Sequence, residues 1–214
     1  MLDADFFRRW LTAAAAAVDR ETERLTELDS AIGDADHGSN LQRGFTAVAA
    51  TLEKEAPDTP GAVLTLAGRQ LISTVGGASG PLYGTLLRRT GKALGDAAEV
   101  DEARFAEALR TGVDAVAALG GAAPGDKTML DALVPALDAL DESFGAAREA
   151  ALQGALTTTP LQARKGRASY LGERSIGHQD PGATSSALLF EALAETAEGH
   201  GSRDGGGARE AGRG

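Results

Sequence analysis

The segment "SNLQRGFTAVAATLEKE" at residues 39–55 carries the pattern that decides the fold. Its large apolar side chains recur at intervals of three or four residues: Leu41, Phe45, Val48 and Leu52. This spacing places them on one face of an α-helix and leaves charged residues on the other faces. Ser39 and Gln42 have the spacing of a capping box, which marks a helix start. The segment therefore predicts an amphipathic helix over 39–55.

The same apolar spacing recurs along most of the chain. Alternating strand patterns are missing, aromatic residues make up 4% of the chain and only three isoleucines occur, so alanine and leucine favour helix over sheet. The predicted helices cover 3–28, 39–55, 61–74, 81–95, 101–119, 127–141, 144–158 and 182–198. Because the links between them are short, neighbouring helices should run antiparallel. We therefore predict an all-α bundle of eight antiparallel amphipathic helices.

Several residues at the predicted boundaries support these helix starts. Pro60 and Pro81 suit the first turn of a helix, where the missing amide hydrogen is not needed. Asp101 and Asp126 can each accept hydrogen bonds from free amides of a first turn. The last stretch, "GHGSRDGGGAREAGRG" at 199–214, is rich in glycine and has no apolar side chain larger than alanine. We expect one helical domain over 1–198 and a disordered tail over 199–214.

The overall composition excludes several classes of protein. The chain has 214 residues, 43% of them hydrophobic, and a net charge of −10, which argues against nonspecific binding to nucleic acid. Its apolar runs are far shorter than the roughly 20 residues that cross a bilayer, and the first residues do not form a secretory signal. We therefore expect a cytoplasmic protein that does not bind membranes. With no cysteine, any metal ion must be held by oxygen or histidine ligands.

Asp29, Asp34 and Asp36 are crowded into the stretch "ELDSAIGDADHGSN" at 27–40. Glycines at 33 and 38 allow sharp turns, so the three carboxylates can converge, and they repel one another unless a cation lies among them. A hard divalent ion such as Mg²⁺ fits that requirement. The alternative is that one or two of them are ordinary solvated caps or turn residues. An EF-hand is excluded, because its fifth and twelfth positions would be glycine and phenylalanine.

The other glycine-rich loops offer weaker signals. "GGAAPGDKT" at 120–128 resembles a Walker A loop, but Asp126 separates Gly125 from Lys127 and the preceding segment is helical, so we reject a P-loop. Its free amides could still meet an anion or a base edge, with a plain interhelix loop as the alternative. "GGASGP" at 76–81 lets backbone approach a phosphate closely, or simply allows a tight helix crossing.

The last loop clusters positive charge in a chain that has little of it. Arg164, Lys165, Arg167 and Arg174 lie within eleven residues, shortly before "DPG" at 180–182. Arginine can bind a phosphate with two hydrogen bonds and stabilise charge during phosphoryl transfer. His178 lies in the same loop, where a structural histidine is the commoner case. No serine-nucleophile elbow or zinc-protease motif accompanies these residues.

Taken together, four motifs resemble a known family. "LDSAIGDADHGSN", "VGGASGPLYGTLL", "GDKTMLDAL" and "YLGERSIGHQDPGATSSALLFEAL" are similar, in order and spacing, to the nucleotide-binding L subunits (DhaL) of dihydroxyacetone kinases. The resemblance spans roughly residues 5 to 198. It departs from the family at Ala35, where glycine is frequent, and at Leu41, where methionine is frequent.

The resemblance implies a barrel of eight antiparallel helices with ADP or ATP bound by loops at one end. In such a site Asp29, Asp34 and Asp36 would hold two Mg²⁺ ions that bridge the phosphates. Arg174 would act on the phosphates as the catalytic residue. The implied nucleotide contacts are His37, Gly38, Ser39, Asn40, Ala78, Ser79, Gly121, Met129, Arg174, Asp180, Pro181 and Gly182.

The resemblance also implies the partners. In the phosphotransferase-linked system a phosphohistidine carrier (M) subunit phosphorylates the tightly held ADP, and the γ-phosphoryl then passes to dihydroxyacetone bound on a separate K subunit. Nothing in this chain matches the K domain, and a homodimer is compatible with the resemblance. The alternative within the same fold is an ATP-dependent homologue acting on another small sugar or an acyl substrate. From a different class, the alternative is a helical interaction module whose acidic loop is merely solvated.

Overall fold

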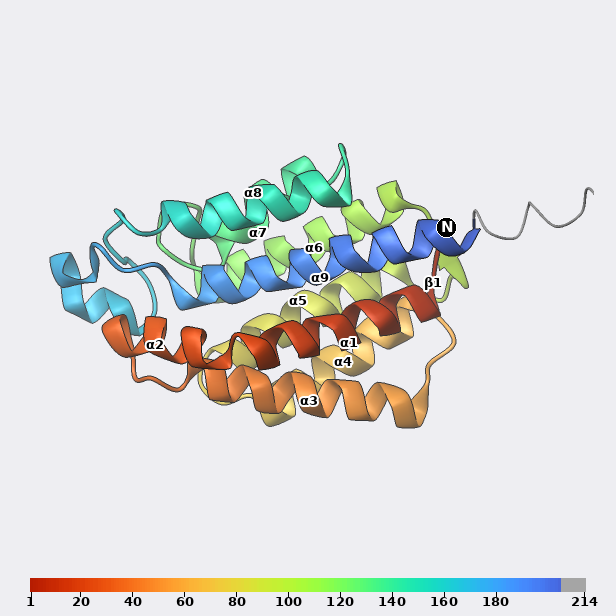
Figure 1. Ribbon diagram of the computed structural model, residues 1–214, viewed down its shortest axis with the longest axis horizontal. Helices are drawn as coiled ribbons and strands as arrows, with labels where there is room; N and C mark the ends of the chain where they lie inside the picture. The colour runs from red at the N-terminus through yellow and green to blue at the C-terminus, as the bar shows by residue number, and fades with distance from the viewer. Residues whose placement is uncertain (205–214) are drawn as a thin grey trace, which may run out of the picture.

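Nine α-helices and one 3-10 helix make up most of residues 1–204, which the computed structural model describes, with side chains to residue 200 (Figure 1). The helices are α1 Ala4–Arg20, α2 Thr22–Ile32, α3 His37–Glu55, α4 Pro60–Thr74, α5 Ser79–Leu94, α6 Glu102–Gly120, α7 Leu130–Ala139, α8 Phe144–Thr157, η1 Arg167–Ser175 and α9 Pro181–Asp204. The all-α prediction is confirmed. Two short strands, β1 Leu2–Asp3 and β2 Glu99–Val100, pair antiparallel and were not predicted.

The predicted helix starts are confirmed at some positions and wrong at others. Asp101 accepts a hydrogen bond from the Arg104 amide at 2.7 Å, and Pro60 is the first residue of α4. The predicted capping box is wrong, because α3 begins two residues earlier and the Ser39 hydroxyl donates to the Asp36 carbonyl oxygen. Asp126 does not cap α7, which begins only at Leu130.

The predicted helix over 3–28 is divided in two. The backbone of Glu21 has φ −98° and ψ 6°, and α1 ends and α2 begins at this residue. At the other end of the chain, α9 continues to Asp204, so its last residues fall inside the segment predicted as a disordered tail. Residues 205–214 of that segment lie outside the described residues.

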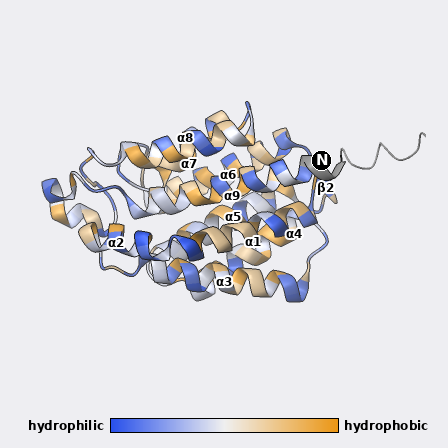
Figure 2. Ribbon diagram, in the orientation of Figure 1, coloured by the Kyte–Doolittle hydropathy of each residue, from blue (hydrophilic) through white to orange (hydrophobic). Residues whose placement is uncertain are grey.

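The long helices pack in a ring. In the order α1, α3, α4, α5, α6, α7, α8 and α9, each packs against the next, and α9 packs back against α1. Helices α4 and α5 approach closely at Gly68, which has no side chain. A Cβ atom at this position would lie 2.6 Å from the Gly84 carbonyl oxygen. Figure 2 shows that most helices carry both hydrophobic and hydrophilic residues. The apolar faces form one buried cluster that includes residues from Leu2 to Leu193.

The bundle has two ends with different roles. One end, which we call the terminal end, holds β1, the start of α1 and the last described part of α9 (Figure 1). The other, which we call the loop end, holds α2, η1 and the glycine-rich loops (Figure 1). Among the residues described, no helix is long and apolar enough to cross a membrane.

Candidate functional site

A cavity of about 400 Å³ opens at the loop end. Its lining residues come from within segments 29–37, 76–83, 116–130, 165–168 and 180–182. These segments include parts of all four glycine-rich loops, although the loops are far apart in the sequence. The alternating directions of the helices therefore bring the four motifs to one place.

Three carboxylates lie at one side of this cavity, and we call Asp29, Asp34 and Asp36 the aspartate triad. One carboxylate oxygen of each lies within 4.8 Å of the others. Asp29 is buried in the last turn of α2, while Asp34 and Asp36 are exposed. Asp29 Oδ2 also accepts hydrogen bonds from the amides of Asp36, at 2.9 Å, and of His37, at 3.2 Å. Asp29 thus fixes the loop that carries the other two.

The turn between the triad residues requires an unusual backbone. Ala35 has φ +60°, a left-handed conformation that L-residues other than glycine rarely adopt. This explains why glycine is the expected residue at this position in the family. Lys127 in the α6–α7 loop also has a positive φ, of 63°. Two of the three described non-glycine residues with positive φ therefore lie at the loop end.

His37 begins α3 and joins a buried polar network. Its Nε2 lies 2.9 Å from Ser185 Oγ and its Nδ1 lies 3.2 Å from Ser79 Oγ. The Tyr83 hydroxyl extends the network to Ser185 at 2.6 Å. Burial lowers the pKa of His37, although Asp29 and Asp36 act in the opposite direction. Burial therefore favours the neutral imidazole, which links α3, α5 and α9.

Asp180 caps α9 beside the cavity and is buried. Its carboxylate accepts a hydrogen bond from the Ala183 amide at 2.7 Å, and its own amide donates to the Thr158 hydroxyl at 2.9 Å. Burial raises the pKa of Asp180 to about 7 with help from the charge of Asp131, while the amides of Ala183 and Gly182 and the Lys127 ammonium partly oppose this shift. This carboxyl therefore titrates near neutral pH.

Lys127 connects segments of the loop end through hydrogen bonds from its buried side chain. Its side chain is buried, and Nζ donates to the carbonyl oxygens of Leu161 at 3.0 Å, Ser175 at 2.7 Å and His178 at 2.5 Å. Burial lowers the pKa of Lys127, while Asp180 acts in the opposite direction. The ammonium is saturated by backbone acceptors, which agrees with the rejection of a P-loop. It ties the α6–α7 loop to the segment that precedes α9.

The exposed cations of the last loop differ in their positions. Arg167 lines the cavity, and its guanidinium lies 3.1 Å from Asp34 Oδ2. Lys165 also lines the cavity. Arg174, the predicted catalytic residue, is exposed near the end of η1 and is not among the cavity-lining residues. His178 is exposed as well, and only its carbonyl oxygen has a structural partner among the hydrogen bonds described.

Most of the predicted site residues line the cavity. These are Asp29, Asp34, Asp36, His37, Ala78, Ser79, Met129, Asp180, Pro181 and Gly182. Gly38, Ser39, Asn40, Gly121 and Arg174 are outside the lining. Gly38 has a packing role instead, because a side chain there would lie 2.2 Å from the Thr22 carbonyl oxygen. Gly121 ends α6 with φ +55°.

Sequence reasoning missed three residues that shape the site: Lys127, Asp131 and Tyr83. The carboxylate of Asp131 accepts hydrogen bonds from the amides of Gly125 at 2.6 Å and Thr128 at 2.7 Å, and so orders the α6–α7 loop. Asp131 was hidden because it reads as a charged residue in the first turn of a helix. Lys127 lies in the "GDKT" stretch at 125–128, and nothing in that local pattern indicates that its side chain is buried.

The triad fits a hard divalent cation. Its carboxylates supply oxygen ligands from a buried and two exposed positions, and their mutual repulsion falls when a cation lies among them. Among the ion pairs described, only the contact between Arg167 and Asp34 compensates the triad. The donor set therefore matches Mg²⁺, which commonly takes a few carboxylates and completes its shell with water or phosphate.

An all-helical ring with a metal-compatible cavity between its end loops defines the class of this protein. A family model described as the DAK2 domain matches residues 31–195, and the chain belongs to this family.

Named relatives agree with that assignment. The chain is 45% identical over 199 residues to the "PEP-dependent dihydroxyacetone kinase, ADP-binding subunit DhaL" of Escherichia coli (strain K12), covering 88% of this chain and 95% of that protein. It is 39% identical to an "L-erythrulose 1-kinase" of Mycolicibacterium smegmatis, covering 86% of this chain but 34% of that longer protein.

A solved structure has the same fold. The dihydroxyacetone kinase of C. freundii, in complex with AMP-PNP and Mg²⁺, superimposes with a TM-score of 0.71 at 30% identity. The match covers 88% of this chain and 33% of the other. The chain therefore spans about a third of that kinase.

Proposed function

We propose that this chain is the ADP-binding subunit of a phosphotransferase-linked dihydroxyacetone kinase. In this function ADP stays bound in the end cavity and is phosphorylated there by a phosphohistidine carrier (M) subunit. The γ-phosphoryl then passes to dihydroxyacetone on a separate K subunit. The observation that carries the proposal is the convergence of four distant loops on one cavity beside the aspartate triad.

The extent of the match differs between the named relatives. The chain covers 95% of the Escherichia coli ADP-binding subunit, but only about a third of the erythrulose kinases. The ring of helices described above supports the eight-helix barrel that the resemblance implies.

In the proposed complex, different residues of the cavity would contact the metal ions, the phosphates and the base of ADP. Asp29, Asp34 and Asp36 would hold two Mg²⁺ ions, which supply the positive charge that lets carboxylates and phosphates share a pocket. Helix α5 begins at Ser79, and its free amides favour an anion there. The buried, apolar surface of Met129 suits one face of a base. The remaining predicted contacts are His37, Gly38, Ser39, Asn40, Ala78, Gly121, Asp180, Pro181 and Gly182.

Arg174 is still proposed as the catalytic residue that acts on the phosphates, although it lies outside the cavity lining. Its exposure means that its side chain would have to turn toward the cavity when nucleotide or a partner is present. The long, flexible arginine side chain and its position on η1 support this, because η1 contains a non-helical residue, Gly172, with φ 56°. A guanidinium there would offset charge that develops during phosphoryl transfer.

The test is whether the purified protein carries ADP and accepts phosphate in place. We expect copurified ADP, thermal stabilisation by added ADP that depends on Mg²⁺, and conversion of the bound ADP to ATP by phosphoenolpyruvate with its carrier proteins. Absence of any Mg²⁺-dependent stabilisation would favour the helical interaction module instead.

The alternative function is that of an ATP-dependent kinase part acting on another small sugar or an acyl substrate. The 39% identity to a named L-erythrulose 1-kinase supports it. Exchange of bound ADP with labelled free ATP separates the two. Exchange within seconds would favour the ATP-dependent enzyme, and retention over hours would favour the phosphotransferase subunit.

A further inference from the structure

Among the ion pairs described, Arg167 is the cation that meets the aspartate triad at the cavity. Its guanidinium lies 3.1 Å from Asp34 Oδ2, and its side chain is 68% exposed. Arg167 is the first residue of η1 and follows Gly166, which has a φ of 65°. Helix α2 and η1 pack against each other. The fold thus presents this arginine to the triad.

No other described cation is available for this task. The Nζ of Lys127 is saturated by three carbonyl oxygens, and the ring nitrogens of His37 lie within hydrogen-bond distance of Ser185 and Ser79. Arg174 is exposed outside the cavity lining, and Lys165 makes no ion pair with the triad among the contacts described. Arg167 therefore compensates the charge of Asp34. Asp29 and Asp36 have no cationic partner among the ion pairs described.

We infer that Arg167 is a positioning residue that exchanges Asp34 for nucleotide phosphate, and so couples metal binding to nucleotide binding. The inference rests on the proposed function. Without nucleotide, a metal ion has to compete with Arg167 for Asp34. When ADP and metal enter together, the freed guanidinium lies at the cavity wall, where it can bind a phosphate with two hydrogen bonds.

This exchange has effects of opposite sign on the two ligands. Removal of the guanidinium leaves Asp34 free for the metal, so metal alone binds more tightly. It also removes a phosphate donor, so ADP binds less tightly. A purely structural arginine would weaken both ligands together, because it would order the same loop for both. The signs therefore separate the two roles.

The experiment compares R167Q with the wild type in two binding measurements. Free Mn²⁺, followed by its electron paramagnetic resonance signal, titrates the nucleotide-free protein. ADP is titrated by calorimetry at saturating Mg²⁺. We expect R167Q to bind Mn²⁺ about two- to fivefold more tightly, the range of an exposed ion pair. We expect it to bind ADP about tenfold or more weakly, as for loss of a charge-assisted contact.

Two further variants sharpen the result. R110Q removes the same charge from an exposed ion pair with Asp138 at 3.4 Å, away from the cavity lining, and should change neither affinity. R167K keeps the charge but not the fork-shaped donor, so it should retain wild-type Mn²⁺ binding and lose part of the ADP affinity.

Each outcome decides something. Weaker binding of both ligands by R167Q, no change in either, or an equal effect of R110Q would overturn the exchange. Failure of the wild type itself to bind Mn²⁺ and ADP would overturn the proposed function instead. The thermal midpoint of the nucleotide-free R167Q protein should stay close to that of the wild type, because the side chain is exposed.

Discussion

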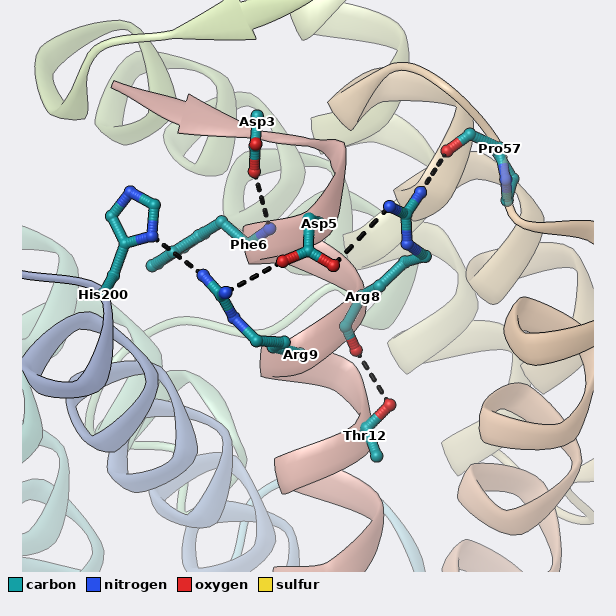
Figure 3. A network of polar contacts seen from close by, with 8 residues as sticks. All are labelled: Asp3, Asp5, Phe6, Arg8, Arg9, Thr12, Pro57 and His200. Atoms are coloured by element: carbon teal, nitrogen blue, oxygen red, sulfur yellow. Dashed lines mark hydrogen bonds and ion pairs between the residues drawn. The ribbon is translucent and has the colours of Figure 1, made fainter. Parts of the chain in front are cut away.

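The two ends of the bundle handle charge in opposite ways. At the terminal end, Arg9 lies 2.8 Å from the Asp5 carboxylate and from His200, and Arg8 donates to the Pro57 carbonyl oxygen at 2.7 Å (Figure 3). Cations and acceptors there are matched close to the surface. At the loop end, the oxygens of three carboxylates lie within 4.8 Å of one another, and among the ion pairs described only Arg167 meets them, at Asp34. The charges are therefore balanced locally at the terminal end and concentrated in one sign at the triad.

Loss of a triad carboxylate should have the largest effect. We expect Asp34→Asn to lower the Mg²⁺-dependent affinity for ADP by more than about 100-fold, because a charged ligand of the metal is lost. Calorimetric titration of ADP at saturating Mg²⁺ measures it. The nucleotide-free protein should be as stable as the wild type or slightly more stable, since repulsion within the triad falls.

The matched control is Asp138→Asn, which breaks the exposed ion pair with Arg110 on the side of the bundle. It should leave ADP binding unchanged. Equal loss of ADP affinity in both variants, or none in either, would contradict a metal site at the triad.

Removal of the Lys127 ammonium should have the next largest effect, on stability. Lys127→Met leaves three carbonyl oxygens without their donor in a buried place, which costs about 3 kcal/mol. The thermal midpoint should fall by roughly 6–12 °C for a chain of this size. Differential scanning calorimetry of the nucleotide-free protein measures both quantities.

The comparison variant lies at the terminal end. Arg8→Met removes a donor to the Pro57 carbonyl oxygen and an ion pair with Asp5, but water can replace both at this surface. We expect a loss of no more than about 1 kcal/mol. Similar losses in Lys127→Met and Arg8→Met would mean that the buried ammonium is not what holds the loop end.

The same contrast explains what the sequence could predict. Apolar periodicity reports the buried faces of long helices, and so the all-α fold and most helix ranges follow from it. Boundaries at the loop end do not, because Lys127 adopts φ +63° and delays the start of α7 to Leu130. That conformation depends on carbonyl oxygens more than thirty residues away, which no local pattern encodes.

The site itself was predictable in part. The triad could be recognised because its three residues lie within eight positions of the sequence and are hard to explain as solvated caps. The ion pair of Arg167 with Asp34 joins residues 133 positions apart, and it depends on how η1 packs against α2. Sequence reasoning found the basic cluster, but it could not tell which arginine turns toward the cavity and which, like Arg174, is exposed outside its lining.

Titration of Asp180 should make the stability of the folded protein depend moderately on pH near neutrality, which surface carboxylates do not do. Burial raises the pKa of Asp180 to about 7, from 3.8 in its unperturbed state. A group whose pKa is higher in the folded state binds more protons there, so its contribution to stability falls as pH rises toward 7. Asp180→Asn cannot ionise and should remove this part of the pH dependence.

The measurement is the thermal midpoint of nucleotide-free protein from pH 5 to pH 8. We expect the wild type to lose stability relative to Asp180→Asn as the pH rises toward about 7, with little further change above that pH. Parallel curves for the two proteins would mean that Asp180 does not titrate near neutral pH.

The smallest expected effect compares one alanine at each end. Ala35 has φ +60° in the triad loop, and Ala56 has φ +40° at the end of α3, beside Pro57 of the terminal end. Glycine relieves about 1 kcal/mol of left-handed strain at either position, but the unfolded chain gains about as much entropy. Both substitutions should therefore change the thermal midpoint by less than about 2 °C. Only Ala35→Gly should speed ADP release, by roughly twofold, because it loosens the loop between Asp34 and Asp36, two of the proposed metal ligands. Pulse-chase release of labelled ADP measures this, and equal release rates in Ala35→Gly and Ala56→Gly would place the rate-limiting motion elsewhere than the triad loop.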